Sequence, residues 1–143
     1  MGATPSAPSS ETPGGEDWGE FPPNHLDARK DLSDPQFPGR VGSFEFESRG
    51  GDANSVYADY DDAENFVGFT AWVIVNANRY SEHIERLTDV DHYGRAVCGH
   101  PGDFPEQTDC YMVGAQHVIY VGTASDISME EMAALLEELY DAL

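Results

Sequence analysis

The order in which strand-like and helix-like segments follow one another most limits the fold of this chain. Six segments have the alternating, β-branched or aromatic pattern of β-strands, and two have helical spacing. The strand-like segments are residues 41–47, 55–60, 67–76, 93–98, 110–115 and 117–122, and the helical ones are 79–88 and 128–143. Short turns between successive strands favour antiparallel pairing. We therefore predict an α+β domain with a mostly antiparallel sheet of about six strands and two helices packed on one face, in the order βββα-βββα.

The C-terminal helix has the clearest sequence signals. Ser128 and Glu131 have the spacing of a capping box, and Ile127 and Met132 are placed to form a hydrophobic staple. Apolar residues then recur at helical spacing up to the C-terminus. The earlier helix, over residues 79–88, has Asn78 as its expected N-cap and leads into a polar connection at residues 89–92.

Composition changes near residue 40. The first fifteen residues, MGATPSAPSSETPGG, contain no large apolar residue after the initiator and cannot support a core. Residues 16–39 include apolar side chains, but these have no period and are interrupted by prolines. We expect residues 1–39 to be a disordered to loosely docked tether and residues 40–143 to form one domain. The alternative for residues 16–39 is an arm that docks on a partner.

Cys98 and Cys110 are the only two cysteines and flank a loop rich in glycine and proline. Strand ends that meet across such a loop bring Cβ atoms close to bridging distance. A disulfide between them would contribute about 3 kcal/mol by the chain-entropy model and would indicate a compartment outside the cytosol. A cytosolic protein with two free thiols is the alternative.

The beginning of the sequence lacks the charged and apolar regions of a signal peptide, so we interpret it as the mature part of an exported protein. Its low-complexity start and its preference for Arg (six residues) over Lys (one residue) resemble the mature regions of lipoproteins from high-GC actinobacteria. That resemblance implies a cell-envelope protein of unassigned function, tethered through a lipidated cysteine outside the given sequence. The implied location is extracytoplasmic, at the cell surface or secreted.

The net charge excludes several classes of partner. With 27 acidic and 7 basic residues the formal charge is −20, which argues against binding to nucleic acids and to anionic membranes. No stretch reaches the roughly 18 apolar residues of a transmembrane helix. The acidity itself has three readings: solubility, attraction to a basic partner protein, and mimicry of nucleic acid.

Motifs for catalysis and cofactor binding are absent from the sequence, so we predict a protein that is not an enzyme and needs no cofactor. Asp59, Asp61, Asp62 and Glu64 form a calcium candidate within one acidic segment, but the EF-hand pattern is not met. A solvated turn is the preferred interpretation, and no metal site is predicted.

These observations lead to a functional hypothesis of a non-enzymatic, extracytoplasmic binding domain whose partner is another protein, with a basic protein among the candidates. The expected binding surface is the exposed face of the sheet or the loop 99–109, where Phe104 lies. Glu137, Glu138 and Asp141 are further candidates, because negative charge near the C-terminus of a helix disfavours folding. The alternative function is an acidic inhibitor that mimics nucleic acid and occupies a basic cleft.

Overall fold

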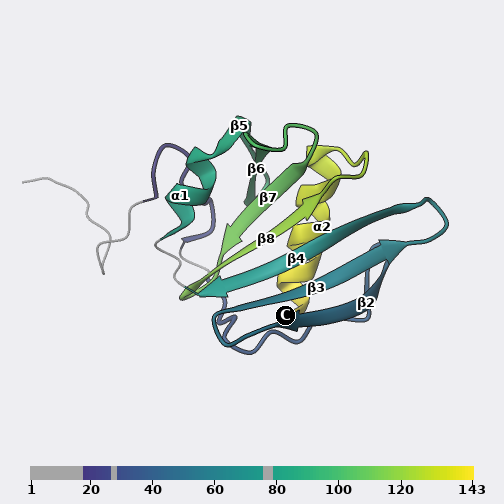
Figure 1. Ribbon diagram of the computed structural model, residues 1–143. Coiled ribbons are helices and arrows are strands. Elements are labelled where there is room, and N and C mark those ends of the chain that lie inside the picture. Colours follow the sequence, from purple (N-terminus) through teal and green to yellow (C-terminus); the bar gives the residue numbers. More distant parts are fainter. Residues whose placement is uncertain (1–17, 27–28, 76–78) are drawn as a thin grey trace, which may run out of the picture.

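A computed structural model describes residues 18–26, 29–75 and 79–143 of the chain. These residues form an antiparallel sheet and two helices (Figure 1). In chain order the elements are β1 (Arg40–Val41), β2 (Phe44–Gly51), β3 (Ser55–Asp62), β4 (Val67–Val75), α1 (Tyr80–Glu85), β5 (Leu87–Tyr93), β6 (Ala96–Pro101), β7 (Thr108–Val113), β8 (His117–Thr123) and α2 (Met129–Ala142).

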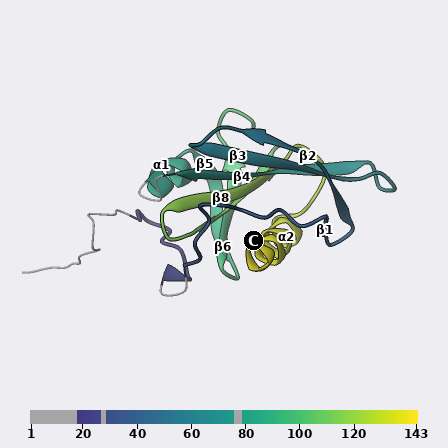
Figure 2. The same ribbon diagram turned by 90° about the horizontal axis from the view of Figure 1, so that it is seen from below.

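The sheet has the strand order β1-β2-β3-β4-β8-β7-β6-β5, and all of its pairs are antiparallel. The chain crosses from one edge to β4, passes through α1 to the other edge, and returns strand by strand to β8. The last strands of the two halves therefore lie side by side in the middle of the sheet. Figure 2 shows the two edges of the sheet descending on either side of α2, so the sheet curves around that helix.

The α+β class and the antiparallel sheet are confirmed, but the described residues form eight strands rather than about six. The strand expected at residues 41–47 is divided by a turn at Gly42, whose φ of 58° favours glycine. β5 occupies the predicted end of the first helix and the expected polar connection. Its register shifts between Thr88 and Asp91, and Asp89 has a φ of 56°. Because of this bulge, the apolar residues Leu87, Val90 and Tyr93 of β5 are three residues apart. In the sequence that spacing resembles a helix.

The two helices lie on opposite faces of the sheet, and the prediction that both pack on one face is wrong (Figure 2). α2 covers the face that we call the inner face, where Leu136 and Leu139 join Met112 and Ile119 in the larger core cluster. α1 lies on the other face, the outer face, where Tyr80 packs in a second cluster. Strands β6, β7 and β8 carry apolar side chains on both faces, so both faces need cover at this end of the sheet.

The N-terminal segment contributes to both clusters. Leu32 is buried in the inner cluster and Trp18 in the outer one, so the packed residues extend beyond the boundary expected at residue 40. Lys30 Nζ donates hydrogen bonds to the carbonyl oxygens of Tyr140 (2.8 Å) and Asp141 (3.0 Å). A cation from the N-terminal segment thus satisfies the C-terminal carbonyl groups of α2. The prediction for residues 1–15 and the expected N-cap at Asn78 lie outside the described residues.

The start of α2 and the disulfide agree with the sequence analysis. Ser128 Oγ accepts a hydrogen bond from the backbone N–H of Glu131 at 3.1 Å, as an N-cap should. Cys98 and Cys110 face each other on β6 and β7 and form a disulfide with an S–S distance of 2.06 Å. Both cysteines are fully buried in the inner cluster beneath α2.

Candidate binding surface

Four aromatic side chains cross the outer face of the sheet in a straight line, which we call the aromatic row. They are Tyr57 on β3, Trp72 on β4, Tyr120 on β8 and Tyr111 on β7, and each is the direct register partner of the next. The ring centroids of Tyr57 and Trp72 are 4.9 Å apart, and those of Tyr111 and Tyr120 are 4.7 Å apart. Cross-strand aromatic pairs of this kind stabilise a sheet. Tyr57, Trp72 and Tyr120 also remain partly exposed, so parts of their rings are available to a ligand.

His83 of α1 closes one end of the aromatic row. Its ring lies against Tyr111, with centroids 5.5 Å apart, and near Tyr120 at 6.1 Å. Burial lowers the pKa of His83, and the positive charges of Arg86 and Arg79 lower it further. The imidazole is therefore a largely neutral wall at neutral pH. From there the aromatic row runs toward β3, away from α1.

A second line of residues, the polar row, lies beside the aromatic row on the same face, two residues further along on each strand. Its members are Asp59, Thr70, Gly122 and Asp109, again in direct register. Thr70 Oγ1 donates to Asp59 Oδ1 at 2.7 Å. At the other end, Gln107 Nε2 donates to Asp109 Oδ1 at 3.0 Å. Ring faces and hydrogen-bond acceptors are thus placed side by side.

Residues of the aromatic row and the polar row together line a hollow on the outer face, which we call the outer pocket, and Gly122 is part of its lining. A Cβ atom at this position would lie only 2.6 Å from Asp109 Oδ1, so a side chain here would displace the carboxylate. The outer pocket has a volume of about 270 Å³ and is lined by Thr70, Trp72, Gln107, Asp109, Tyr120, Gly122, Thr123 and Ala124. Its walls combine the rings of Trp72 and Tyr120 with the polar groups of Thr70, Gln107, Asp109 and Thr123.

Asp109 is the unusual group of the outer pocket because its carboxylate is buried with no Lys or Arg partner among the described residues. The residue is 5 % exposed. Burial raises the pKa of its carboxyl group, while the polar contacts with Gln107 and Tyr111 and the charge of His100 act in the opposite direction. Within the described part of the chain, no Lys or Arg side chain forms an ion pair with it. Buried carboxylates are normally paired with a cation, which makes Asp109 an exception.

The loop predicted to bind is connected to the outer pocket through Gln107. The backbone N–H of Gln107 donates to the carbonyl oxygen of Phe104 at 2.9 Å, and the Gln107 carbonyl oxygen is 2.8 Å from Nδ1 of His100. Phe104 itself is 64 % exposed and does not line the pocket. The loop 99–109 and the exposed sheet face, which the sequence analysis treated as alternatives, therefore meet at one site.

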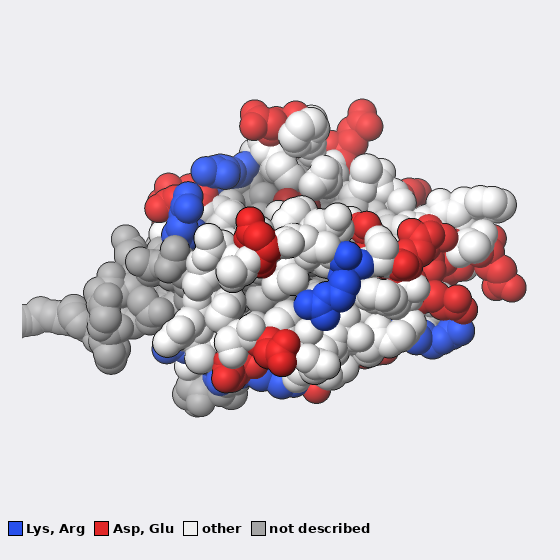
Figure 3. All heavy atoms as spheres, turned by 60° about the horizontal axis from the view of Figure 1, so that its bottom comes forward, with Lys and Arg blue, Asp and Glu red and all other residues white. Residues whose placement is uncertain are grey.

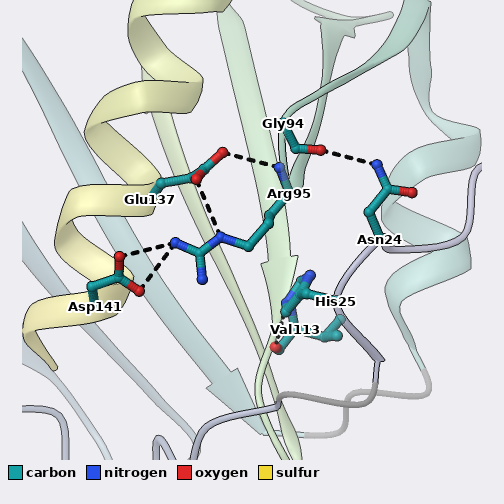
Figure 4. A network of polar contacts seen from close by, with 7 residues as sticks. All are labelled: Asn24, His25, Gly94, Arg95, Val113, Glu137 and Asp141. Carbon is teal, nitrogen blue, oxygen red and sulfur yellow. Dashed lines mark hydrogen bonds and ion pairs between the residues drawn. The ribbon is translucent and has the colours of Figure 1, made fainter.

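The three acidic candidates of α2 have partners within the chain, and Figure 4 shows those of Glu137 and Asp141. Glu137 accepts hydrogen bonds from the backbone N–H of Arg95 at 2.9 Å and from its Nε at 3.1 Å. Asp141 forms an ion pair with Arg95 Nη2 at 3.0 Å. Glu138 accepts from the backbone N–H of Gly42 at 2.8 Å. These contacts hold the β5–β6 and β1–β2 turns, at the two edges of the sheet, against the end of α2, and they give the three charges a structural role.

The same network includes the N-terminal segment (Figure 4). Asn24 Nδ2 donates to the carbonyl oxygen of Gly94 at 2.9 Å, and His25 Nε2 lies 2.8 Å from the carbonyl oxygen of Val113. His25 is buried, and burial is the main cause that lowers its pKa. The network therefore fastens the segment to the inner side of the sheet.

The four calcium candidates serve mainly local contacts. Asp62 accepts hydrogen bonds from Ser43 Oγ and Asn65 Nδ2, both at 2.8 Å, and the bonds from Asn65 and Ser43 lower the pKa of its carboxyl group. Asp59 accepts from Thr70. Asp61, Asp62 and Glu64 line a shallow hollow at the end of β3. Among the residues that the structure describes, no group of three or more His, Cys, Asp or Glu side chains is arranged to hold a metal ion.

Comparison with protein-family models, curated proteins and solved structures found no match to this chain. Over its described residues, no helix is long and apolar enough to cross a lipid bilayer. The exposed sheet face is expected from the sequence, but Trp72, Tyr120 and Asp109 are not recognisable there as its key residues. The signal in the sequence is one aromatic residue on each of four strands, at positions that face each other across the sheet. It can be recognised only when the strand registers are known.

Proposed function

We propose that this protein is a non-enzymatic binding domain that acts outside the cytosol and binds its ligand on the outer face of the sheet, at the outer pocket. The observation that carries this proposal is the aromatic row beside the polar row, with the outer pocket lined by residues of both. Aromatic faces give contact area at a small entropic cost, and converging polar groups orient a ligand. On the outer face, α1 does not cover β3 and β4, and Tyr57 and Trp72 are partly exposed there, so a ligand can reach these strands (Figure 1).

The location outside the cytosol is supported by the disulfide. Both cysteines of the chain are used, and the bridge is buried beneath α2. Structural disulfides persist in oxidising compartments. We place the protein at the cell surface or among secreted proteins, tethered to the cell envelope. Trapping of free thiols with an alkylating reagent in intact native cells tests this part: the proposal expects no labelling of Cys98 or Cys110 in the unreduced protein.

Two observations favour a binding role over mimicry of nucleic acid: the charge pattern on one side of the molecule and the lining of the outer pocket. On the face drawn in Figure 3, acidic side chains form several separate groups with Lys and Arg side chains between them. A mimic would present a continuous acidic surface to a basic cleft. The outer pocket, in contrast, has a defined shape and a mixed aromatic and polar lining.

Amide and indole N–H spectra of the labelled protein test the proposal. We would add two sets of probes: tetrasaccharides, and nonapeptides that are basic, neutral or acidic. At least one probe should shift the signals of Trp72, Tyr120 and Gly122 in a saturable way, and Trp72→Ala should abolish this effect. If every probe leaves these signals unchanged, or if saturable shifts occur only elsewhere, the proposal is wrong.

A further inference from the structure

We propose that the outer pocket binds the side chain of an arginine or lysine presented by a basic partner protein, with the cationic group at Asp109 and the aliphatic stem across Trp72 and Tyr120. This inference rests on the proposed function and adds the chemistry of its ligand. It follows from three properties of the described residues: the charge at the base of the pocket, the rings that form its wall, and the charge of the surrounding surface.

The first property is the carboxylate of Asp109. The residue is 5 % exposed, and its polar contacts are with two uncharged groups, the amide of Gln107 at 3.0 Å and the side chain of Tyr111. A desolvated carboxylate without a cation is costly to the fold, and the arrival of an ammonium or guanidinium group relieves that cost. Asp109 lines the outer pocket beside Gly122, whose missing side chain leaves room for the carboxylate, since a Cβ atom there would stand 2.6 Å from Oδ1. A cation can therefore reach the carboxylate from the side of the pocket.

The second property is the aromatic wall. Trp72 and Tyr120 are direct register partners, and both line the outer pocket next to Asp109. A cation above an aromatic face is attracted by the negative charge of the π-system, most strongly for tryptophan. The flat guanidinium group of arginine also stacks on such rings while it bonds a carboxylate. The pocket, at about 270 Å³, suits the head and stem of one side chain.

The third property is the charge around the pocket. Asp59 stands at the other end of the polar row, and its hydrogen bonds come from the uncharged hydroxyl groups of Thr70 and Ser48. The whole chain carries a formal charge of −20. Such a field attracts basic proteins and speeds their association, whereas it does nothing for a neutral sugar. Charge complementarity therefore selects a basic protein over a carbohydrate, although both would use aromatic faces.

The test compares three probes on the wild-type protein by chemical-shift titration. The first is a blocked nonapeptide with one central arginine among glycine and serine residues, and the second has citrulline, the neutral isostere, in place of arginine. The third is chitotetraose. We expect the arginine peptide to shift Trp72, Tyr120 and Gly122 saturably, with a Kd at least fivefold lower than that of the citrulline peptide. Raising the salt concentration should weaken its binding.

Variants assign the effect to the carboxylate. Asp109→Asn should weaken binding of the arginine peptide at least fivefold and should bring its Kd close to that of the citrulline peptide. The matched control, Asp103→Asn, removes an exposed carboxylate from the same loop and should change the Kd less than twofold. Asp109→Asn should also raise the melting temperature, because it removes a buried charge. Gly122→Ala is a second variant, which keeps the charge but displaces the carboxylate of Asp109 from its position, and it should also weaken binding of the arginine peptide.

The outcomes separate this inference from the proposed function. Equal binding of the arginine and citrulline peptides, or binding that survives Asp109→Asn, would overturn the inference. Chitotetraose binding at the outer pocket without arginine binding would also overturn it, and would leave the proposed function in place. If neither these three probes nor the wider sets of tetrasaccharides and nonapeptides affect the outer pocket, both are wrong.

Discussion

Removal of the three acidic side chains at the end of α2 should destabilise the protein. The variant is Glu137→Gln, Glu138→Gln and Asp141→Asn. From the sequence alone, the helix dipole leads to the opposite expectation, since negative charge near the C-terminus of a helix is unfavourable. The contacts with Arg95 and Gly42 reverse the sign.

The magnitudes decide which effect is larger. The Arg95–Glu137 pair, at 3.1 Å with side chains 35 % and 30 % exposed, should contribute about 0.5–1 kcal/mol, and the more exposed Arg95–Asp141 pair less. The bonds from the backbone N–H groups of Arg95 and Gly42 to carboxylates would weaken to bonds with neutral amides, at about 0.5 kcal/mol each. Relief of the dipole returns about 0.3 kcal/mol per residue, and Lys30 already offsets part of that term. We expect a net loss of about 1 kcal/mol.

Urea denaturation and thermal melting measure this loss. For a domain of this size, 1 kcal/mol corresponds to about 3–5 °C in Tm. The matched control carries Glu47→Gln, Glu64→Gln and Glu106→Gln, three exposed acids for which the described part of the chain shows no ion pair. It removes the same net charge without breaking contacts and should be as stable as the wild type or slightly more stable. A triple α2 variant as stable as this control would refute the reasoning.

Three further outcomes are expected. Reduction of the Cys98–Cys110 disulfide should cost about 3 kcal/mol and lower the Tm, and mass spectrometry of the unreduced protein should show a deficit of about two daltons; an unchanged Tm after reduction would argue against a stabilising role. Leu136→Ala, which leaves a cavity in the inner cluster, should lower the free energy of unfolding in urea by about 2–5 kcal/mol. Ser128→Ala, which removes the N-cap of α2, should lower it by about 1 kcal/mol. Equal losses would contradict the roles of core residue and cap. The folded-state pKa of His25 lies below its usual 6.5, so near that pH the folded protein binds fewer protons than the unfolded chain. The contribution of His25 to the free energy of unfolding should therefore be complete above pH 6.5 and decrease as the pH drops below it. His25→Gln should reduce the loss of stability between pH 7.5 and 5.5, and an unchanged pH profile would exclude His25 as the source of that loss.

The sequence predicts the elements that depend on local pattern. The run Val67–Val75 is β-branched or aromatic over most of its length and forms β4, and Ser128 and Glu131 mark the start of α2 through the cap itself. The disulfide is predictable as well, because the turn-rich segment between Cys98 and Cys110 makes them ends of neighbouring strands. In each case the deciding interactions join residues close in sequence.

Features that depend on distant residues are not predictable in this way. β5 pairs with β6 through a bulge at Asp89, and its apolar spacing of three imitates a helix. The opposite placement of the two helices follows from apolar residues on both faces of β6–β8, and a short apolar run does not reveal which face a helix will cover. The contacts of Arg95 with α2 span more than forty residues and could not be inferred from the helix alone.

The candidate site shows the same limit. Trp72, Tyr120 and Asp109 lie on three strands and become neighbours through the pairings β4–β8 and β7–β8. The sequence indicates that each is part of a strand, and a shift of one residue in either pairing would send the side chains of that strand to the inner face. Only the register places the aromatic row beside the polar row, and it makes Gly122 part of the lining of the outer pocket.

The most direct measurement of the central claim uses the two tryptophan indole N–H signals of the protein. Trp72 lines the outer pocket, while Trp18 is buried in the outer cluster with Tyr80. Titration with the arginine nonapeptide should move the Trp72 signal saturably and leave the Trp18 signal in place, and Asp109→Asn should suppress that movement. A Trp72 signal that does not move, or a Trp18 signal that moves in its place, would contradict the assignment of the outer pocket as the binding site for a basic side chain.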